Sequence, residues 1–135
     1  MSDMFSALSV ATSGMGAYKT WLNAVADNIA NADNITSTSN PAFQERFVQV
    51  QAATGDDGIG DGVRVAGVTF GDPQGRVISD PNNPLADAKG MVRQSSVDMT
   101  EQMVHMQLAQ RGYQANVSSF QAAKQAYEAI LSIGK

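Results

Sequence analysis

The densest group of chemically capable side chains lies in the stretch Gly55-Asp56-Asp57-Gly58-Ile59-Gly60-Asp61-Gly62. Three carboxylates among glycines could coordinate a calcium ion. An EF-hand loop, however, places its ligands at fixed positions and ends in a bidentate glutamate, and this stretch has neither. It also lacks the Gly-Lys-Ser/Thr ending of a phosphate-binding loop. We therefore expect a solvated surface loop, with a calcium binder or an aspartate-dependent hydrolase as the weakest alternative.

The remaining titratable residues offer little chemistry. The chain has no cysteine, which excludes thiol nucleophiles, thiolate zinc sites and disulfides, and His105 is its one histidine. We expect His105 to be a packing or interface residue, because it has no histidine partner for a metal site or a proton relay. Asp72 and Asp80 lie beside prolines and are typical of turns. The sequence therefore predicts no catalytic, cofactor-binding or metal-binding residue. We expect that the protein is not an enzyme.

Charge and hydropathy exclude further classes. The 135 residues include nine Lys and Arg against 13 Asp and Glu, a net charge of −4, and the basic residues are dispersed. A nucleic-acid-binding face would gather them, so we expect no nucleic-acid partner, and we expect no small-molecule substrate. The sequence contains no membrane-spanning run of about 18 apolar residues. The first residues lack the basic and apolar regions of a classical secretory signal, so we expect any export to use another route.

The N-terminal stretch has a helical period. Apolar residues recur there at alternating steps of four and three, which is a heptad pattern typical of a helix that packs on a partner helix: Met4, Leu8, Ala11, Met15, Tyr18, Leu22, Val25, Ile29 and Ala32. We expect an N-terminal helix within residues 1–34.

The C-terminal stretch, residues 97–135, supplies the partner. One register collects Met99, Met103, Met106, Tyr113, Val117, Phe120, Tyr127 and Leu131. Asp98 is placed to cap the start of this helix, with Glu101 three residues later, and Gly134 is placed to close its end. We predict that the two helices form an antiparallel, coiled-coil-like pair.

The middle of the chain, residues 35–96, changes character. Turn motifs such as Asn40-Pro41 alternate with short β-branched and aromatic runs at 47–50, 63–70 and 76–78. These runs predict two to four strands in a small, irregular β module. The predicted fold class is therefore α+β, with an N-terminal helix (1–34), a β-rich module (35–96) and a C-terminal helix (97–135).

The helices are poor in charge. Residues 1–32 and 97–135 hold nine of the 22 charged residues (nine basic and 13 acidic), and their outer faces carry Ser, Thr, Asn, Gln and Ala. Such faces, with the glycines at 14, 16 and 112, favour close packing of several helices, whereas a free hairpin usually keeps a charged outer face. We therefore predict a subunit of an assembly, with an ordinary monomeric helical hairpin as the alternative. The predicted seam and assembly residues are Leu8, Met15, Tyr18, Leu22, Val25, Ile29, Met103, Met106, Tyr113, Val117, Phe120 and Tyr127.

Particular motifs resemble those of the bacterial flagellar rod and hook proteins. The stretch 27–33 contains Asn28-Ile29-Ala30-Asn31, which is similar to the family's Asn-Ile/Leu-Ala-Asn motif, and the stretch 13–17 resembles its Ser/Gly-Met-x-Ala element. Near the other end, 101–104 and the run Tyr113-Gln114-Ala115-Asn116 after Arg111-Gly112 match its C-terminal helix pattern.

A second set of motifs resembles one branch of that family, the proximal-rod proteins. These motifs are Asp80-Pro81-Asn82-Asn83-Pro84-Leu85-Ala86-Asp87, Gly90-Met91-Val92 and Ser96-Val97-Asp98. The stretch 40–43 resembles the branch's Gly-x-Pro-Tyr turn, with the glycine replaced and Phe43 in place of tyrosine, and the basic residues that usually follow are reduced to Arg46. Residues 54–75 have no match.

The resemblance implies a structural role. It implies a subunit of the proximal rod of the flagellar basal body, stacked helically into the drive shaft that transmits torque from the motor to the hook. The implied partners are copies of itself, other proximal and distal rod proteins, the rod–membrane-ring adaptor and the flagellar type III export apparatus. The implied location is the periplasmic rod, reached without a cleaved signal peptide. The alternatives are another rod protein of the family and a soluble dimeric coiled-coil adaptor unrelated to the flagellum.

Overall fold

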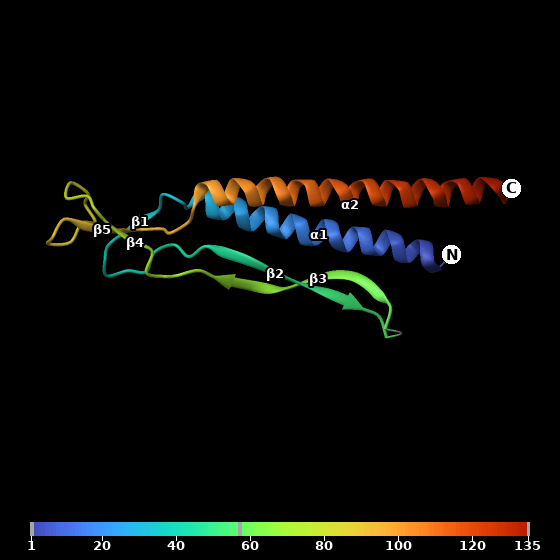
Figure 1. Ribbon diagram of the computed structural model, residues 1–135, viewed down its shortest axis with the longest axis horizontal. Coiled ribbons are helices and arrows are strands. Elements are labelled where there is room, and N and C mark those ends of the chain that lie inside the picture. The colour runs from blue at the N-terminus through green and yellow to red at the C-terminus, as the bar shows by residue number, and fades with distance from the viewer. Residues whose placement is uncertain (1, 57, 135) are drawn as a thin grey trace. The chain divides into compact units, whose positions relative to one another are not determined.

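A computed structural model describes residues 2–56 and 58–134, and the side chains from Phe5 onward within those ranges. In this part of the chain a long helix comes first, five strands follow, and a second long helix comes last, so the chain is α+β. The elements in chain order are α1 Ser2–Ala30, β1 Ile35–Thr36, β2 Arg46–Thr54, β3 Gly60–Phe70, β4 Arg76–Ser79, β5 Met91–Gln94 and α2 Met99–Ile133 (Figure 1). The side chain of Met4 and the whole of Asp57, both named above, lie outside the described residues.

The chain divides into two compact units, and each unit takes a piece of both helices. The first unit comprises Met1–Leu22, Val48–Gly67 and Gln107–Lys135, and the second comprises Asn23–Phe47 and Val68–Met106. In the described part of the chain, neither helix contains an apolar stretch long enough to cross a membrane.

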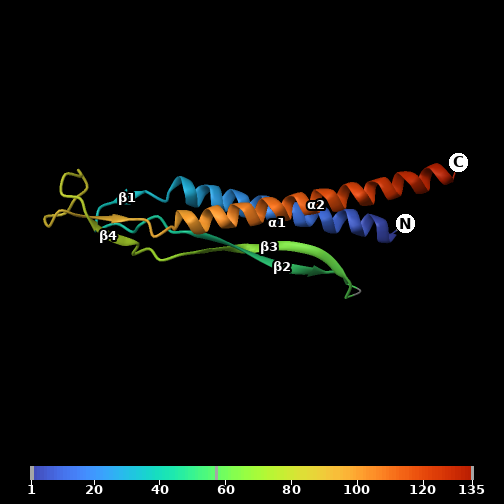
Figure 2. The ribbon, with the colours of Figure 1, turned by 45° about the horizontal axis from the view of Figure 1, so that its top comes forward.

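In the first unit, the early residues of α1 lie beside the late residues of α2. The rings of Phe5 and Tyr127 have centroids 5.5 Å apart. The strands β2 and β3 form a two-stranded sheet, and their hairpin runs alongside the N-terminal part of α1 in both views (Figures 1 and 2). The hairpin is tied to α1 where the backbone N–H of Val63 donates to Ser13 Oγ at 3.1 Å.

That tie depends on a glycine. Gly62 has φ of +92°, and a Cβ there would lie 2.2 Å from Ser13 Oγ and 3.2 Å from the Cα of Val10. Because glycine has no Cβ, it both adopts the left-handed backbone and lets the hairpin approach α1 closely.

In the second unit, a three-stranded antiparallel sheet has the order β1-β5-β4. Ile35 pairs with Gln94 on one side of β5, and Arg76 pairs with Gln94 on the other. Gly75 precedes β4 with φ of +55°, and a Cβ there would lie 2.3 Å from the carbonyl oxygen of Gln94. Val92 and Ser95 are buried because β5 and the residue after it pack closely between the two neighbouring strands.

The start of α2 is capped as predicted. Asp98 Oδ1 accepts hydrogen bonds from the backbone N–H of Thr100 at 2.8 Å and of Glu101 at 3.2 Å, so the carboxylate satisfies two N–H groups that the first turn leaves free. The end of α1 is held by Asn31, whose Nδ2 donates to the carbonyl oxygen of Asp27 at 2.9 Å.

The three runs predicted as strands lie within β2, β3 and β4. The strands β1 and β5 were not among the predicted strands. They are two and four residues long, which is too short to show a clear alternation of apolar and polar residues.

Candidate assembly interface

A buried amide network joins α1, α2 and the start of β2. Asn28 in α1 is 1% exposed and Gln102 in α2 is 0% exposed. Asn28 Nδ2 donates to Gln102 Oε1 at 3.0 Å and to the carbonyl oxygen of Arg46 at 3.1 Å, while Asn28 Oδ1 accepts the N–H of Arg46 at 2.9 Å. The Asn28 side chain therefore pairs with both backbone groups of Arg46, as a neighbouring strand would.

Gln102 extends the network to an acidic side chain. Its Nε2 donates to Glu45 Oε1 at 2.5 Å. Partial burial raises the pKa of Glu45 above its ordinary value; the hydrogen bond from Gln102 opposes that shift, and the nearby carboxylates of Glu101 and Asp98 add to it. With these contacts, every side-chain nitrogen and oxygen of Asn28 and Gln102 has a hydrogen-bond partner.

An ion pair lies at the rim of this network. Arg46 Nη1 pairs with Asp27 Oδ2, and both side chains are more than one third exposed. The Arg46 guanidinium also lies 5.9 Å from the centre of the Phe43 ring. Because solvent screens an exposed pair, it contributes little stability and mainly orients Arg46.

In the first unit, two glycines let side chains of the opposite helix enter between the backbones. A Cβ at Gly14 would lie 2.2 Å from Asn116 Oδ1, and a Cβ at Gly112 would lie 2.3 Å from the ring atoms Cε1 and Cζ of Tyr18. Each glycine is thus a notch filled by one larger residue. Asn116 Nδ2 meanwhile donates to the carbonyl oxygen of Gly112 at 2.8 Å.

The buried residues of the helices are mostly small. They include Ala11, Gly14, Ala17, Ala24, Val25, Asn28, Gln102 and Ala109. Buried alanines and glycines bring helix backbones together, because no long side chain holds them apart.

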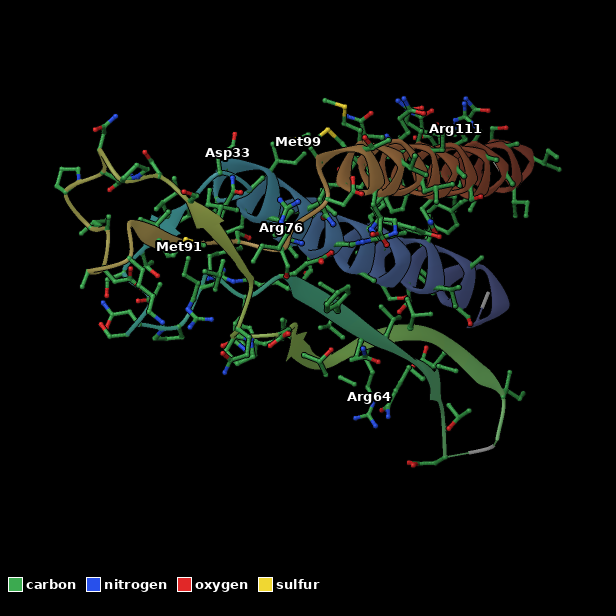
Figure 3. All side chains as sticks on the ribbon, turned by 60° about the vertical axis from the view of Figure 1, so that its left-hand side comes forward. Asp33, Arg64, Arg76, Met91, Met99 and Arg111 are labelled. Atoms are coloured by element: carbon green, nitrogen blue, oxygen red, sulfur yellow. The ribbon has the colours of Figure 1, made fainter. Side chains whose placement is uncertain are left out.

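Several large apolar side chains of α2 are exposed. Val104, Leu108, Ile130 and Leu131 are each about half exposed. Figure 3 shows Arg111 on the side of α2 that faces away from α1, and Arg64 projecting from β3; Arg64 Nη2 donates to Gln51 Oε1 at 3.2 Å. The exposed surface of α2 therefore combines these apolar side chains with uncharged polar ones such as Gln107, Ser118 and Gln125.

The first unit also contains an apolar groove between α1 and the hairpin. It has a volume of about 280 Å³ and is lined by Ala17, Tyr18, Trp21, Val48, Val50 and Val63. No charged residue lines it, and its mostly aliphatic and aromatic lining suits an apolar group. Among residues 2–56 and 58–134, no cluster of three or more His, Asp or Glu side chains could hold a metal ion.

Comparisons with known proteins match the chain over nearly its whole length. The family model described as the C-terminal part of the flagellar basal body rod FlgEFG proteins matches residues 88–133. The flagellar basal-body rod protein FlgC of Yersinia enterocolitica is 36% identical over 133 residues, which cover 98% of this chain and 99% of the relative. The chain belongs to the FlgC family. The FlgC proteins of Salmonella typhimurium and Aquifex aeolicus are each 35% identical, covering 93% and 95% of this chain and 94% and 95% of the relatives.

Membership of the FlgC family identifies the chain as a structural subunit of the flagellar basal-body rod and not an enzyme. It assembles with other components of the rod and basal body, where it is located. The predicted family is therefore confirmed, and the relatives give no support to a soluble coiled-coil adaptor.

The FlgC-type motif residues have different structural roles. Asn28 is at the centre of the buried network, Asn31 closes α1, and Asn116 fills the notch at Gly14. Ile29 is half-buried, whereas Ala30, Tyr113, Gln114 and Ala115 are exposed. The motifs therefore combine residues that hold this chain together with residues that face outward.

The residues predicted for the seam fall into three groups. Val25 is 1% exposed and thus in the core, and Tyr18 contacts α2 at Gly112. Met103 and Tyr113 are 55% and 36% exposed, so within this chain they do not lie in a buried seam. The others are half-buried: Leu8, Met15, Leu22, Ile29, Met106, Val117, Phe120 and Tyr127.

Sequence reasoning missed Gln102 and Glu45. An apolar heptad search passes over Gln102 because it is polar, although it lies seven residues before Ala109, which is also buried. That seven-residue spacing is the signal that could have found it.

Proposed function

We propose that this chain stacks helically, with copies of itself and other rod proteins, in the proximal part of the rod that transmits torque from the motor to the hook. The observation that carries the proposal is the set of large apolar side chains that α2 exposes. Val104 and Leu108, one helical turn apart, and Ile130 and Leu131, near the end of α2, are each about half exposed. Exposed apolar side chains grouped in this way favour contacts with another protein.

The two helices act in this proposal as an antiparallel, coiled-coil-like pair. Contacts of Phe5 with Tyr127 and of Tyr18 with Gly112 in the first unit support that orientation. The Asn28–Gln102 hydrogen bond in the second unit supports it as well. The N-terminal (1–34) and C-terminal (97–135) segments then form the assembling part, and residues 35–96 form a module attached to it.

Residues exposed on the pair are available to neighbouring subunits. Met103 and Tyr113 belong to this group, and we assign them to contacts between subunits. The half-buried members of the predicted set contribute to both the seam and the assembly.

The route to the rod in this proposal is the flagellar type III export apparatus, which delivers the chain to the periplasmic rod. The partners there are proximal and distal rod proteins and the rod–membrane-ring adaptor. The absence of cysteine suits this route, because an oxidising compartment cannot cross-link the arriving chain.

The test places a charge on the outer face of α2. In cells whose own copy of the gene is deleted, Leu108→Glu should abolish swimming and the recovery of this chain in purified hook–basal bodies by mass spectrometry. Leu108 is half exposed, so the variant should fold normally, and equal circular dichroism and export would show that it does.

The matched control is Thr54→Glu, which adds the same charge at the exposed end of β2. It should leave swimming and particle composition unchanged. Normal rods in the Leu108→Glu cells would show that this face of α2 makes no essential contact. Intact flagella in the deletion strain would overturn the proposed role itself.

A further inference from the structure

Three contacts between α1 and α2 have the same residue-number sum. The paired residues 14 and 116, 18 and 112, and 28 and 102 each add to 130, and the long side chains of Phe5 and Tyr127 meet at a sum of 132. Two of these pairs are glycine notches filled by a larger side chain, and the third is the buried amide pair. A constant sum means that each pair belongs to the same antiparallel register.

Part of the buried seam does not select that register. Ala17 and Ala24 are both buried and lie seven residues apart, so a shift of α1 by one heptad would exchange one alanine for the other. A polar residue at a heptad core position, in contrast, is satisfied in one register only, and this is the best-attested use of a buried polar group in paired helices.

We infer that the Asn28–Gln102 pair, assisted by the notches at Gly14 and Gly112, is a register lock that fixes how α1 and α2 align. A one-heptad shift brings Asn28 opposite Ala109 and leaves its amide without Gln102. The same shift brings Gly14 opposite Ala123 and leaves the notch empty. Because Asn28 also holds both backbone groups of Arg46, the lock sets where β2 begins relative to α1.

The inference rests on the proposed pairing of the helices and adds what determines it. A single register fixes the positions of the outer residues of α1, measured along the helix axis, relative to those of α2. A helical lattice of identical subunits needs this, because every copy must offer its neighbours the same surface.

The cysteine-free sequence allows a direct test. A Cβ at position 14 would lie 2.7 Å from Asn116 Cγ, which is one bond from the Cβ of Asn116. The two Cβ atoms would then be about 4 Å apart, within the range of a disulfide. Gly14→Cys with Asn116→Cys therefore reports the native register. Gly14→Cys with Ala109→Cys or with Ala123→Cys reports a shift by one heptad in either direction.

Each reporter pair is placed in the full-length chain with native Asn28 and Gln102, or with Asn28→Leu and Gln102→Leu together. The double leucine variant replaces both partners by apolar groups, so it removes the lock without leaving an unpaired buried amide. The yield of disulfide is measured by mass spectrometry after mild oxidation, for the purified chain and for chain recovered in hook–basal bodies.

With native Asn28 and Gln102, we expect only the 14–116 pair to cross-link. In the leucine background, the ratio of native to shifted cross-links should fall by at least about tenfold. An unchanged ratio would overturn the register lock while leaving the helix pairing intact. No cross-link in any reporter would instead overturn the proposed pairing, and the lock with it.

The notches give a second, independent measurement. Gly14→Asn and Asn116→Gly each disturb one notch, and the double exchange restores a large residue opposite a glycine. We expect the double variant to recover at least half of the loss in melting temperature that the worse single variant shows. Additive losses would show that the notch does not act as a pair.

Discussion

The ring of Tyr18 in α1 fills the space that a side chain at position 112 in α2 would need. A Cβ added to Gly112 would lie 2.3 Å from two atoms of that ring, closer than any real Cβ contact. Because the obstacle is a large aromatic ring inside a helix contact, it cannot move without disturbing the packing around it. The relationship makes residue size, and not hydrophobicity, the property that matters at position 112.

The first prediction compares two glycines within helices. Gly112→Ala should lower the free energy of unfolding by about 1–3 kcal/mol, because it overpacks the contact with Tyr18. Gly16→Ala is the matched control: nothing lies within 4 Å of its added Cβ, and alanine favours the helix by up to about 1 kcal/mol. Thermal unfolding of the purified chains, followed by circular dichroism, measures both. Equal effects at the two positions would contradict the notch.

The second prediction concerns the buried amide of Asn28. Asn28→Ala removes three hydrogen bonds and leaves the N–H and the carbonyl of Arg46 without their partner, which should cost about 3 kcal/mol. Asn23→Ala removes the same side chain from an exposed position of α1 and should change stability by less than about 0.5 kcal/mol. Urea unfolding of the two variants gives the comparison. A small loss for Asn28→Ala would mean that water replaces these bonds.

The third prediction follows from Glu45. Burial raises the pKa of Glu45 in the folded chain above its ordinary value of 4.5, so the folded state holds this proton more tightly than the unfolded state. The contribution of Glu45 to stability is therefore largest at low pH and falls as pH rises from about 4.5 through the raised pKa.

Glu45→Gln tests that dependence, because glutamine keeps an acceptor for Gln102 Nε2 and does not ionise. Relative to the native chain, the variant should gain stability as pH rises through this window, in urea titrations at several pH values. A native-to-variant difference that stays constant with pH would contradict the role of burial.

The fourth prediction concerns the turn before β5. Asp87 Oδ1 accepts the backbone N–H of Met91 at 3.0 Å and of Lys89 at 2.8 Å, and Thr38 Oγ1 donates to Asp87 Oδ2 at 3.0 Å. The hydrogen bond from Met91, followed by that from Lys89, lowers the pKa of Asp87 below 3.8. Its stabilising effect is therefore complete above that value and is lost as pH falls through the lowered pKa.

Asp87→Ala should speed hydrogen exchange at the amides of Lys89 and Met91, since both lose their acceptor. The exchange rates at these two positions should rise at neutral pH, while those in the capped first turn of α2 stay unchanged. Protection that persists at Met91 would show that the turn is held by other contacts.

Some of the fold could be predicted from residue types alone. The cap at Asp98, the extent of both helices and three strands follow from local rules that need no tertiary information. The family was predicted from several short motifs in a fixed order, because residue identities at given positions are more specific than a helical period.

The packing surface of the helices was harder to predict, for a physical reason. A search for a heptad stripe selects the largest apolar residues, such as Met15 and Leu22. The contact in the first unit instead uses Gly14 beside Met15, since closely spaced backbones need small residues between them. The burial of Asn28 and Gln102 was not predicted for a related reason. A polar amide side chain is expected at the surface unless its hydrogen-bond partners are known. These partners come from segments far apart in the chain, which one sequence does not reveal.

The alanine- and glycine-rich seam also has an entropic consequence. Alanine and glycine have no rotamer freedom to lose, so bringing these helices together costs little side-chain entropy, and it also buries little hydrocarbon. The net free energy of the contact between the two helices is therefore the small difference between a small entropic cost and a small hydrophobic gain. We therefore expect contacts with neighbouring rod subunits to raise the population of paired helices.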